Sequence, residues 1–166
     1  MSDTGAKVCG TVESEAWWGS FTTTLINTSD DSRALHMGDI GAAAEISDFT
    51  FGIPGGATIN GIEVVAEFSC SNATQTAFID LSLSYDDGAN YTAAKEESVT
   101  GVTDKSKTYG GPTDTWGRAW TAAEFADGTF RIKVLGFTSH GTYYCRLDYL
   151  YAIVYYTLIG NVIIWS

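Results

Sequence analysis

The chain has 166 residues, of which 45% are hydrophobic, 13% aromatic and only 17% charged. This length suits one domain, which buries roughly 70% of its extended surface on folding, and the apolar content argues against disorder. Twenty Asp and Glu residues against nine Lys and Arg give a net charge of −11, which would repel phosphate backbones, so we expect no nucleic-acid partner.

The N-terminal segment differs from the rest of the chain. Residues 1–16 carry few large apolar side chains, and we expect them to form an arm ahead of a domain that spans residues 17–157. The opening MSDTGAKVCG lacks a basic stretch followed by an apolar run, so the sequence predicts folding in a cytoplasm. Since no stretch of about 18 uncharged apolar residues occurs, we expect no membrane partner.

The first half of the chain is predicted to form strands. Short strands are expected at Phe21–Asn27 and Phe49–Ile53. From Ile62 to Phe68 the even-numbered residues are apolar and alternate with mostly polar ones, the period of a half-buried strand. In Ala77–Tyr85 the odd-numbered residues form the apolar set. Because the connection Cys70–Gln75 is polar and turn-forming, we expect these two strands to pair as antiparallel neighbours.

The second half continues this pattern and adds one helical signal. Short strands are expected at Ser98–Val102 and between Phe130 and Phe137, and the tyrosine-rich run Thr142–Thr157 predicts a long strand at the centre of a sheet. Thr121 followed by Glu124 has the spacing of a capping box and predicts a helix of one or two turns. The expected fold is all-β, an antiparallel β-sandwich or jelly roll with one very short helix.

The last nine residues, 158–166, are almost wholly apolar and include a predicted strand at Val162–Trp165. Such a segment could close the domain's own sheet or pair with a neighbouring subunit as an added strand. The candidate assembly contacts are Ile159, Val162, Ile163, Ile164 and Trp165.

The chain offers few groups for catalysis. Its two histidines, His36 and His140, lie in segments typical of solvated or locally bonded side chains. Three cysteines, Cys9, Cys70 and Cys145, form no CxxC pair and indicate neither a zinc site nor a disulfide framework. The phosphate-loop, zinc-hydrolase and serine-hydrolase motifs are missing from the sequence. We therefore predict that the protein is not an enzyme and has no catalytic residues, no cofactor and no metal.

The segment Ser84–Tyr91 resembles an Asp-box, a hairpin found in sialidases and other β proteins, with Tyr91 in place of the tryptophan. That motif is a folding element, because its Asp and Gly build the turn. A cation site at Asp86, Asp87 and Asn90 is the alternative.

Two longer blocks carry a resemblance to a known family. They are FTFGIPGGATINGIEV, at Phe49–Val64, and YGGPTDTWGRAWTAAEF, at Tyr109–Phe125, which is followed by FRIKV and LDYLYAIVYYT. In order and spacing they resemble a small β-sandwich domain that recurs in proteins of tailed phages and prophages, over roughly Trp17–Thr157. The chain departs from that pattern with Ala-Asp-Gly after Phe125 and with the apolar tail.

The resemblance implies a bacteriophage virion structural protein, made in the host cytoplasm and most simply a capsid decoration or cement protein. Such a protein would bind the major capsid protein or other virion proteins and form a homo-oligomer, with a trimer favoured. The alternatives are a tail, baseplate or fibre component, or a carbohydrate-binding adhesin module.

Six residues of the matching blocks are expected to specify the fold: Pro54, Trp116, Gly117, Trp120, Asp148 and Tyr149. Trp116 and Trp120 could cover one end of the sandwich beside the short helix, or stack on sugars through exposed indole faces. Asp148 lies within the long strand and would need partners such as loop N–H groups.

Overall fold

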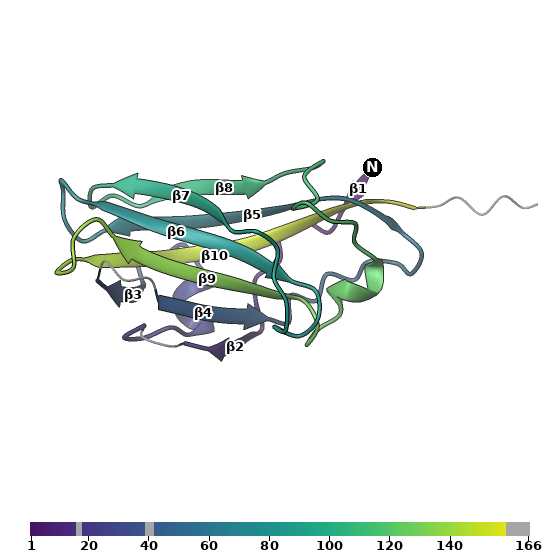
Figure 1. Cartoon of the computed structure of the whole chain (residues 1–166), viewed down its shortest axis with the longest axis horizontal. Coiled ribbons are helices and arrows are strands. Elements are labelled where there is room, and N and C mark those ends of the chain that lie inside the picture. Colours follow the sequence, from purple (N-terminus) through teal and green to yellow (C-terminus); the bar gives the residue numbers. More distant parts are fainter. Residues whose placement is uncertain (16–17, 39–41, 159–166) are drawn as a thin grey trace, which may run out of the picture.

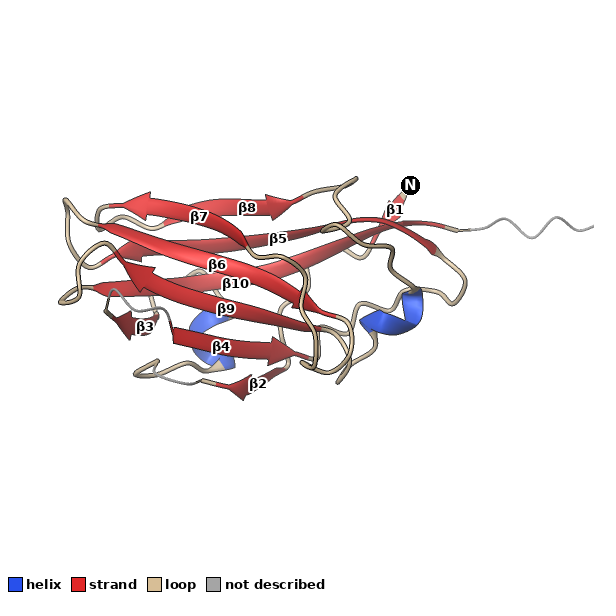
Figure 2. Cartoon of the chain, in the orientation of Figure 1, coloured by secondary structure: helices blue, strands red, loops and turns tan. Residues whose placement is uncertain are grey.

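Two antiparallel five-stranded sheets pack face to face in the computed structural model, which describes residues 1–15, 18–38 and 42–158 (Figures 1 and 2). Sheet A contains β1 (Ser2–Asp3), β3 (Ala34–Met37), β5 (Thr58–Cys70), β8 (Lys105–Gly110) and β10 (Tyr144–Thr157). Sheet B contains β2 (Thr11–Ser14), β4 (Ala42–Ser47), β6 (Thr76–Ser84), β7 (Lys95–Thr100) and β9 (Arg131–Thr138). Two short helices, α1 (Thr23–Ile26) and η1 (Ala122–Phe125), complete the described part.

The long strand β10 lies at the centre of sheet A, as its composition predicts. It pairs with β5 along one side and with β1 and β3 along the other. In sheet B the central strand is β9, between β4 and β6, and the strands β2 and β7 form the edges. The predicted β-sandwich is therefore confirmed, and Figure 1 shows the two layers.

The core fills the space between the sheets, and the predicted alternation identifies its members. The fully buried residues of β5 include Ile62, Val64, Ala66 and Phe68, and the fully buried apolar residues of β6 are Ala77, Ile79, Leu81 and Leu83. Complete burial of an aliphatic or aromatic side chain stabilises the fold by about 1.5–3 kcal/mol. Both inward faces were thus predicted correctly.

The predicted pairing of these two strands is wrong. The segment from Cys70 to Gln75 crosses from one layer to the other, so that β5 pairs with β8 and β10 while β6 pairs with β7 and β9. Alternation shows which side of a strand is buried, but it does not show whether the next strand lies beside it or opposite it.

The predicted short strands in the first half are also corrected. Within Phe21–Asn27 the chain forms α1, and Phe49–Ile53 is an irregular segment outside both sheets. Left-handed backbone at Asp48, Thr50 and Gly52, with φ of 59, 50 and 66°, prevents regular pairing there.

The remaining boundaries need smaller changes. The strand expected at Ser98–Val102 is β7, which begins earlier, at Lys95, and ends at Thr100. The first residues contribute β1 to sheet A and β2 to sheet B, so the boundary predicted at residue 16 does not separate an arm from the sandwich. The strand expected at Val162–Trp165 and all five candidate assembly contacts of the tail lie outside the described residues.

The capping box is present at η1. The backbone N–H of Thr121 donates to Glu124 Oε2 at 2.6 Å, and the Arg118 guanidinium pairs with the other oxygen of the same carboxylate at 2.7 Å. Burial opposes the charge of Glu124, but the hydrogen bonds from Arg118 and Thr121 outweigh it and hold the pKa of Glu124 below its ordinary value.

Replacing Glu124 with glutamine is expected to lower the free energy of unfolding by about 1 kcal/mol at neutral pH, because the charged capping acceptor is lost. Since the folded pKa lies below the unfolded one, this contribution is present above the ordinary pKa of 4.5 and is lost as the pH falls through the folded value. Urea unfolding of both proteins at several pH values between neutral and acidic checks this. A difference in the free energy of unfolding between the two proteins that stayed constant with pH would contradict this prediction.

Candidate binding surface

The histidines and cysteines lie apart from any catalytic arrangement among the described residues. His36 is buried on β3, and His140 is exposed in the turn after β9. All three thiols are buried and free. Burial raises the pKa of Cys9 to about 12 and raises that of Cys145 further, so both remain protonated and weakly nucleophilic at neutral pH.

The Asp-box-like segment is a hairpin whose acidic groups serve the turn. Both oxygens of Asp86 accept hydrogen bonds from Asn90, one from its backbone N–H and one from its side-chain amide, each at 2.7 Å. The same hydrogen bonds lower the pKa of Asp86. Asp87, at a φ of 60°, instead forms an ion pair with Arg131. These contacts favour the folding element over the cation site expected as its alternative.

Trp116 and Trp120 are buried at one end of the sandwich, with 5% and 7% of their surface exposed. The indole N–H of Trp116 donates to the carbonyl of Ile62 at 3.0 Å, and that of Trp120 donates to the carbonyl of Thr115 at 2.8 Å. Trp120 also packs against Phe125 of η1. Neither indole presents an open face, so sugar stacking on these two residues is not supported.

The two blocks of the sequence resemblance contact each other in the structure. The loop after β8 folds over the start of β5, where the N–H of Gly111 and the indole of Trp116 both donate to the carbonyl of Ile62. The N–H of Ile62 donates in turn to the carbonyl of Asp114 at 2.9 Å. Gly117 follows Trp116 at a φ of 77°, a backbone conformation that favours glycine.

The remaining predicted fold residues lie in a turn and in the central strand. The carbonyl of Pro54 accepts the N–H of Ala57 in the turn before β5. Asp148 sits at an irregularity in the pairing of β10 with β5, between Leu147 and Tyr149, where a bulge re-aims a side chain. Burial raises the pKa of Asp148, and the backbone of a loop residue, Asp31, lies close to its carboxylate and opposes that rise, so a loop N–H is the nearby group, as the sequence predicts.

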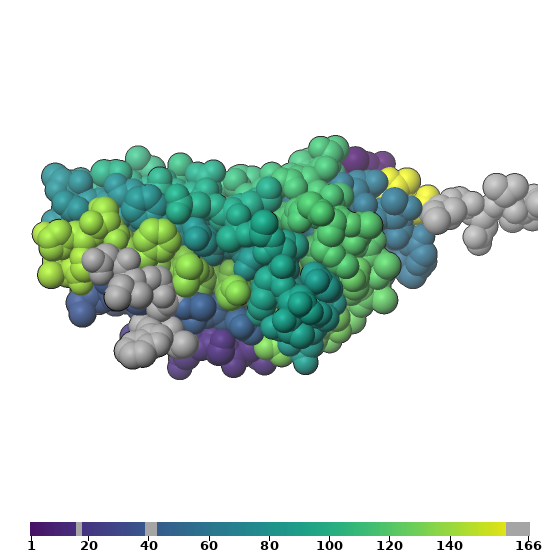
Figure 3. Space-filling model, viewed as in Figure 1, coloured from purple at the N-terminus to yellow at the C-terminus, as the bar shows by residue number. Residues whose placement is uncertain are grey.

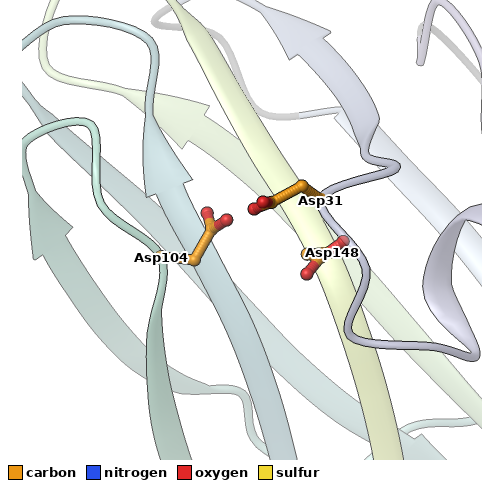
Figure 4. Close-up of side chains that lie close together, drawn as sticks. All are labelled: Asp31, Asp104 and Asp148. Atoms are coloured by element: carbon orange, nitrogen blue, oxygen red, sulfur yellow. The ribbon is translucent and has the colours of Figure 1, made fainter.

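An acidic pocket surrounds Asp148 on the outside of sheet A. It has a volume of about 530 Å³ and is lined by Ser29, Asp30, Asp31, Arg33, Glu67, Val102, Thr103, Asp104 and Asp148. Carboxylate oxygens of Asp31, Asp104 and Asp148 come within 4.8 Å of one another, and Figure 4 shows that they arise from three separate segments. No local sequence pattern reveals this cluster, because its members lie far apart along the chain.

A row of tyrosines on the same outer surface was also missed. Tyr149, Tyr151 and Tyr155 of β10 alternate with the buried even-numbered positions and are partly exposed. On the neighbouring strand β5, Glu67 pairs with Tyr149, and Glu63 lies near Tyr155. The hydroxyl of Tyr155 donates to the carboxylate of Glu63 at 3.4 Å. We call these five residues the tyrosine face. The alternation of tyrosine in YLYAIVY was the signal that could have revealed it.

The rings of the tyrosine face all come from the central strand β10. The rings of Tyr149 and Tyr151 are 5.3 Å apart between centroids and tilted by 46°. Burial, followed by the charge of Glu63, raises the pKa of Tyr151, so its hydroxyl stays protonated and can donate. In Figure 3 residues of β6 and β9, two strands of sheet B, form part of the surface toward the viewer, whereas the tyrosine face belongs to sheet A.

Comparison with known proteins finds similarity in structure only. No family model and no curated protein matches the sequence. A solved structure described as CBM32 of AlyQ in complex with 4,5-unsaturated mannuronic acid aligns with a TM-score of 0.56 at 19% identity, covering 89% of this chain and 96% of that one. The protein shares a jelly-roll β-sandwich fold with it.

Two further structures align with lower TM-scores. TmCBM61 in complex with β-1,4-galactotriose gives 0.42 at 18% identity over 76% of this chain and 73% of that one. A xylan-binding domain from CBM 22 gives 0.35 at 16% identity over 93% and 89%.

Among the described residues, none of the helices combines the length and the apolar character needed to cross a bilayer.

Proposed function

We propose that the protein is a non-catalytic β-sandwich module that binds carbohydrate through the tyrosine face. The observation that carries the proposal is the row of Tyr149, Tyr151 and Tyr155 on the outer side of the central strand. A partly exposed aromatic row beside carboxylates is a surface of the kind that binds sugars, since rings cover apolar sugar faces while polar groups orient the hydroxyls. The shared fold with a carbohydrate-binding module supports this choice.

The strand geometry gives the surface a regular spacing. Side chains two residues apart on one strand are separated by about 6.7 Å along its axis, so Tyr149 and Tyr151 can contact successive parts of an extended chain. On the next strands, Glu63 and Glu67 offer acceptors, and Ser106 pairs opposite Glu67. Because β10 and β5 are paired along most of their length, little ordering is needed on binding.

The charge of the surface sets the expected class of sugar. Two carboxylates, Glu63 and Glu67, lie within the tyrosine face, and the chain carries a net charge of −11. These charges would repel a uronate, so we expect neutral glycans to be preferred over acidic ones. This expectation differs from the uronic acid bound by the CBM32 structure.

Replacing Tyr151 with alanine is expected to raise the Kd for a neutral oligosaccharide by at least about tenfold, because it removes the central aromatic contact. Isothermal titration with a panel of neutral oligosaccharides, and with mannuronate oligomers beside it, measures both affinity and class. Tyr144→Ala is the matched control, since Tyr144 is exposed at the far end of the same strand. Wild-type protein that binds no neutral glycan, or equal losses in both variants, would contradict the proposal.

A virion structural role is the second candidate. It rests on the resemblance of Phe49–Val64 and Tyr109–Phe125 to the phage domain, and a capsid decoration protein is its most specific form. It predicts a stable trimer in solution that co-migrates with shells of the major capsid protein. Light scattering followed by mixing with shells tests this, and a monomer that ignores shells would leave the carbohydrate-binding module, or a tail or fibre component, as the better explanation.

A further inference from the structure

The acidic pocket carries far more negative charge than the residues around it neutralise. Among the residues that line it there are five carboxylates and one guanidinium, that of Arg33. Arg33 binds Asp31 and Asp104, and its Nε lies 2.8 Å from Asp104 Oδ2. A second arginine, Arg146, lies nearby but donates its hydrogen bonds to Ser69 and to backbone carbonyls. An excess of negative charge therefore remains in a partly enclosed space.

Two carboxylate oxygens in the pocket, Oδ1 of Asp104 and Oδ1 of Asp148, are buried without a hydrogen-bond donor among the described residues. Asp148 is 2% exposed, and its Oδ1 has no partner among the described residues. Buried polar atoms nearly always have a partner, and a charged one that lacks it is costly unless a cation or a proton compensates.

We propose that the pocket binds a divalent cation, calcium in preference to magnesium, through carboxylate oxygens of Asp31, Asp104 and Asp148. These oxygens already lie within 4.8 Å of one another (Figure 4). The donors are hard oxygen atoms only, which suits calcium or magnesium better than zinc or copper.

Calcium is the better fit because of the shape of the site. It accepts about six to eight oxygen ligands in flexible geometry, including waters, whereas magnesium demands a near-ideal octahedron. Here the donors come from an exposed loop residue, from the chain before β8 and from the bulge of β10, an irregular set beside a pocket of about 530 Å³. Waters in that space can complete the coordination. Arg33 can keep its contact with Oδ2 of Asp104 on the outer side.

Cation binding would join three segments that the backbone ladders leave separate. Asp31 lies in the loop before β3, Asp104 precedes β8, and Asp148 belongs to the central strand. A ligand that binds only the folded state stabilises it by mass action. Calcium at about one hundred times its Kd is therefore expected to raise the Tm by about 5–10 °C for a chain of this size.

The test compares thermal unfolding of chelator-treated protein in calcium chloride, in magnesium chloride and in neither. Asp148→Asn and Asp31→Asn should abolish most of the calcium shift. Both variants should fold, because Asp148 carries an unfavourable buried charge, and because Asp31, at a φ of 66° with an exposed side chain, is in a conformation that asparagine tolerates. Asp87→Asn, in an ion pair with Arg131 elsewhere on the molecule, should keep the shift.

Terbium luminescence provides a second readout that does not depend on stability. Tyr149 is adjacent to Asp148, so bound terbium should be sensitised by tyrosine excitation and displaced by calcium. Absence of both the calcium shift and this signal would overturn the proposal, as would an undiminished shift in Asp148→Asn. An equal shift with magnesium would overturn the calcium preference. No sugar enters these measurements, so their outcome is independent of the proposed function.

Discussion

Replacing Gly110 with alanine is expected to destabilise the protein by about 4 kcal/mol or more, or to prevent folding. A Cβ at this position would lie 2.3 Å from the carbonyl oxygen of Ile62 and 2.6 Å from the indole nitrogen of Trp116. Neither neighbour can withdraw, because the same carbonyl and indole form a hydrogen bond in the buried junction between β5 and the loop after β8. Losses of this size arise from strain and overpacking in a packed region.

A matched glycine separates this clash from backbone strain. Gly52 has a φ of 66°, close to the 73° of Gly110, but a Cβ there would meet nothing within 4 Å. Gly52→Ala should therefore lower the free energy of unfolding by only about 1–2 kcal/mol, the cost of left-handed backbone in a residue that has a Cβ. Urea unfolding gives both values, and equal losses in the two variants would show that the close contact in the structure is not rigid.

Replacing Trp116 with alanine is also expected to have a large effect, a loss of about 4 kcal/mol in the free energy of unfolding. The indole is 5% exposed, and its removal would leave a cavity at the end of the sandwich and remove a hydrogen bond to Ile62. Trp116→Phe keeps most of the volume and should cost only about 1–2 kcal/mol, since the carbonyl of Ile62 still accepts the N–H of Gly111.

Denaturant unfolding of the two Trp116 variants measures these losses of stability, and glycan binding by the folded variants distinguishes a packing role from a recognition role. If the residue specifies the fold, both variants should retain whatever glycan binding the wild-type protein shows at temperatures where they remain folded. Loss of glycan binding in a fully folded Trp116→Phe variant would instead revive the sugar-stacking interpretation of this tryptophan.

The tyrosine face and the acidic pocket adjoin at Glu67, which belongs to both. A cation bound by Asp104 and Asp148 would offset part of the negative charge beside Tyr149. The two proposals nevertheless fail separately, because Tyr151→Ala changes no carboxylate and Asp31→Asn leaves every ring in place. Together they place the chemistry of the molecule on the outside of sheet A.

Local patterns in the sequence determined much of the fold. The alternation in Ile62–Phe68 and Ala77–Tyr85 predicted the buried sides of β5 and β6, and the composition of Thr142–Thr157 predicted the central strand. The spacing of Thr121 and Glu124 predicted η1. Each of these features depends on neighbours a few residues away, so a single sequence is sufficient to reveal it.

Only the tertiary structure decided which segments meet. The crossing at Cys70–Gln75, the burial of both tryptophans and the assembly of the acidic pocket all depend on contacts between distant parts of the chain. Asp31, Asp104 and Asp148 each follow ordinary local patterns, and nothing in their immediate sequence marks them as neighbours. Side-chain period determines which face of a strand is buried, whereas the free energy of packing the whole chain selects its partners, and with them the site.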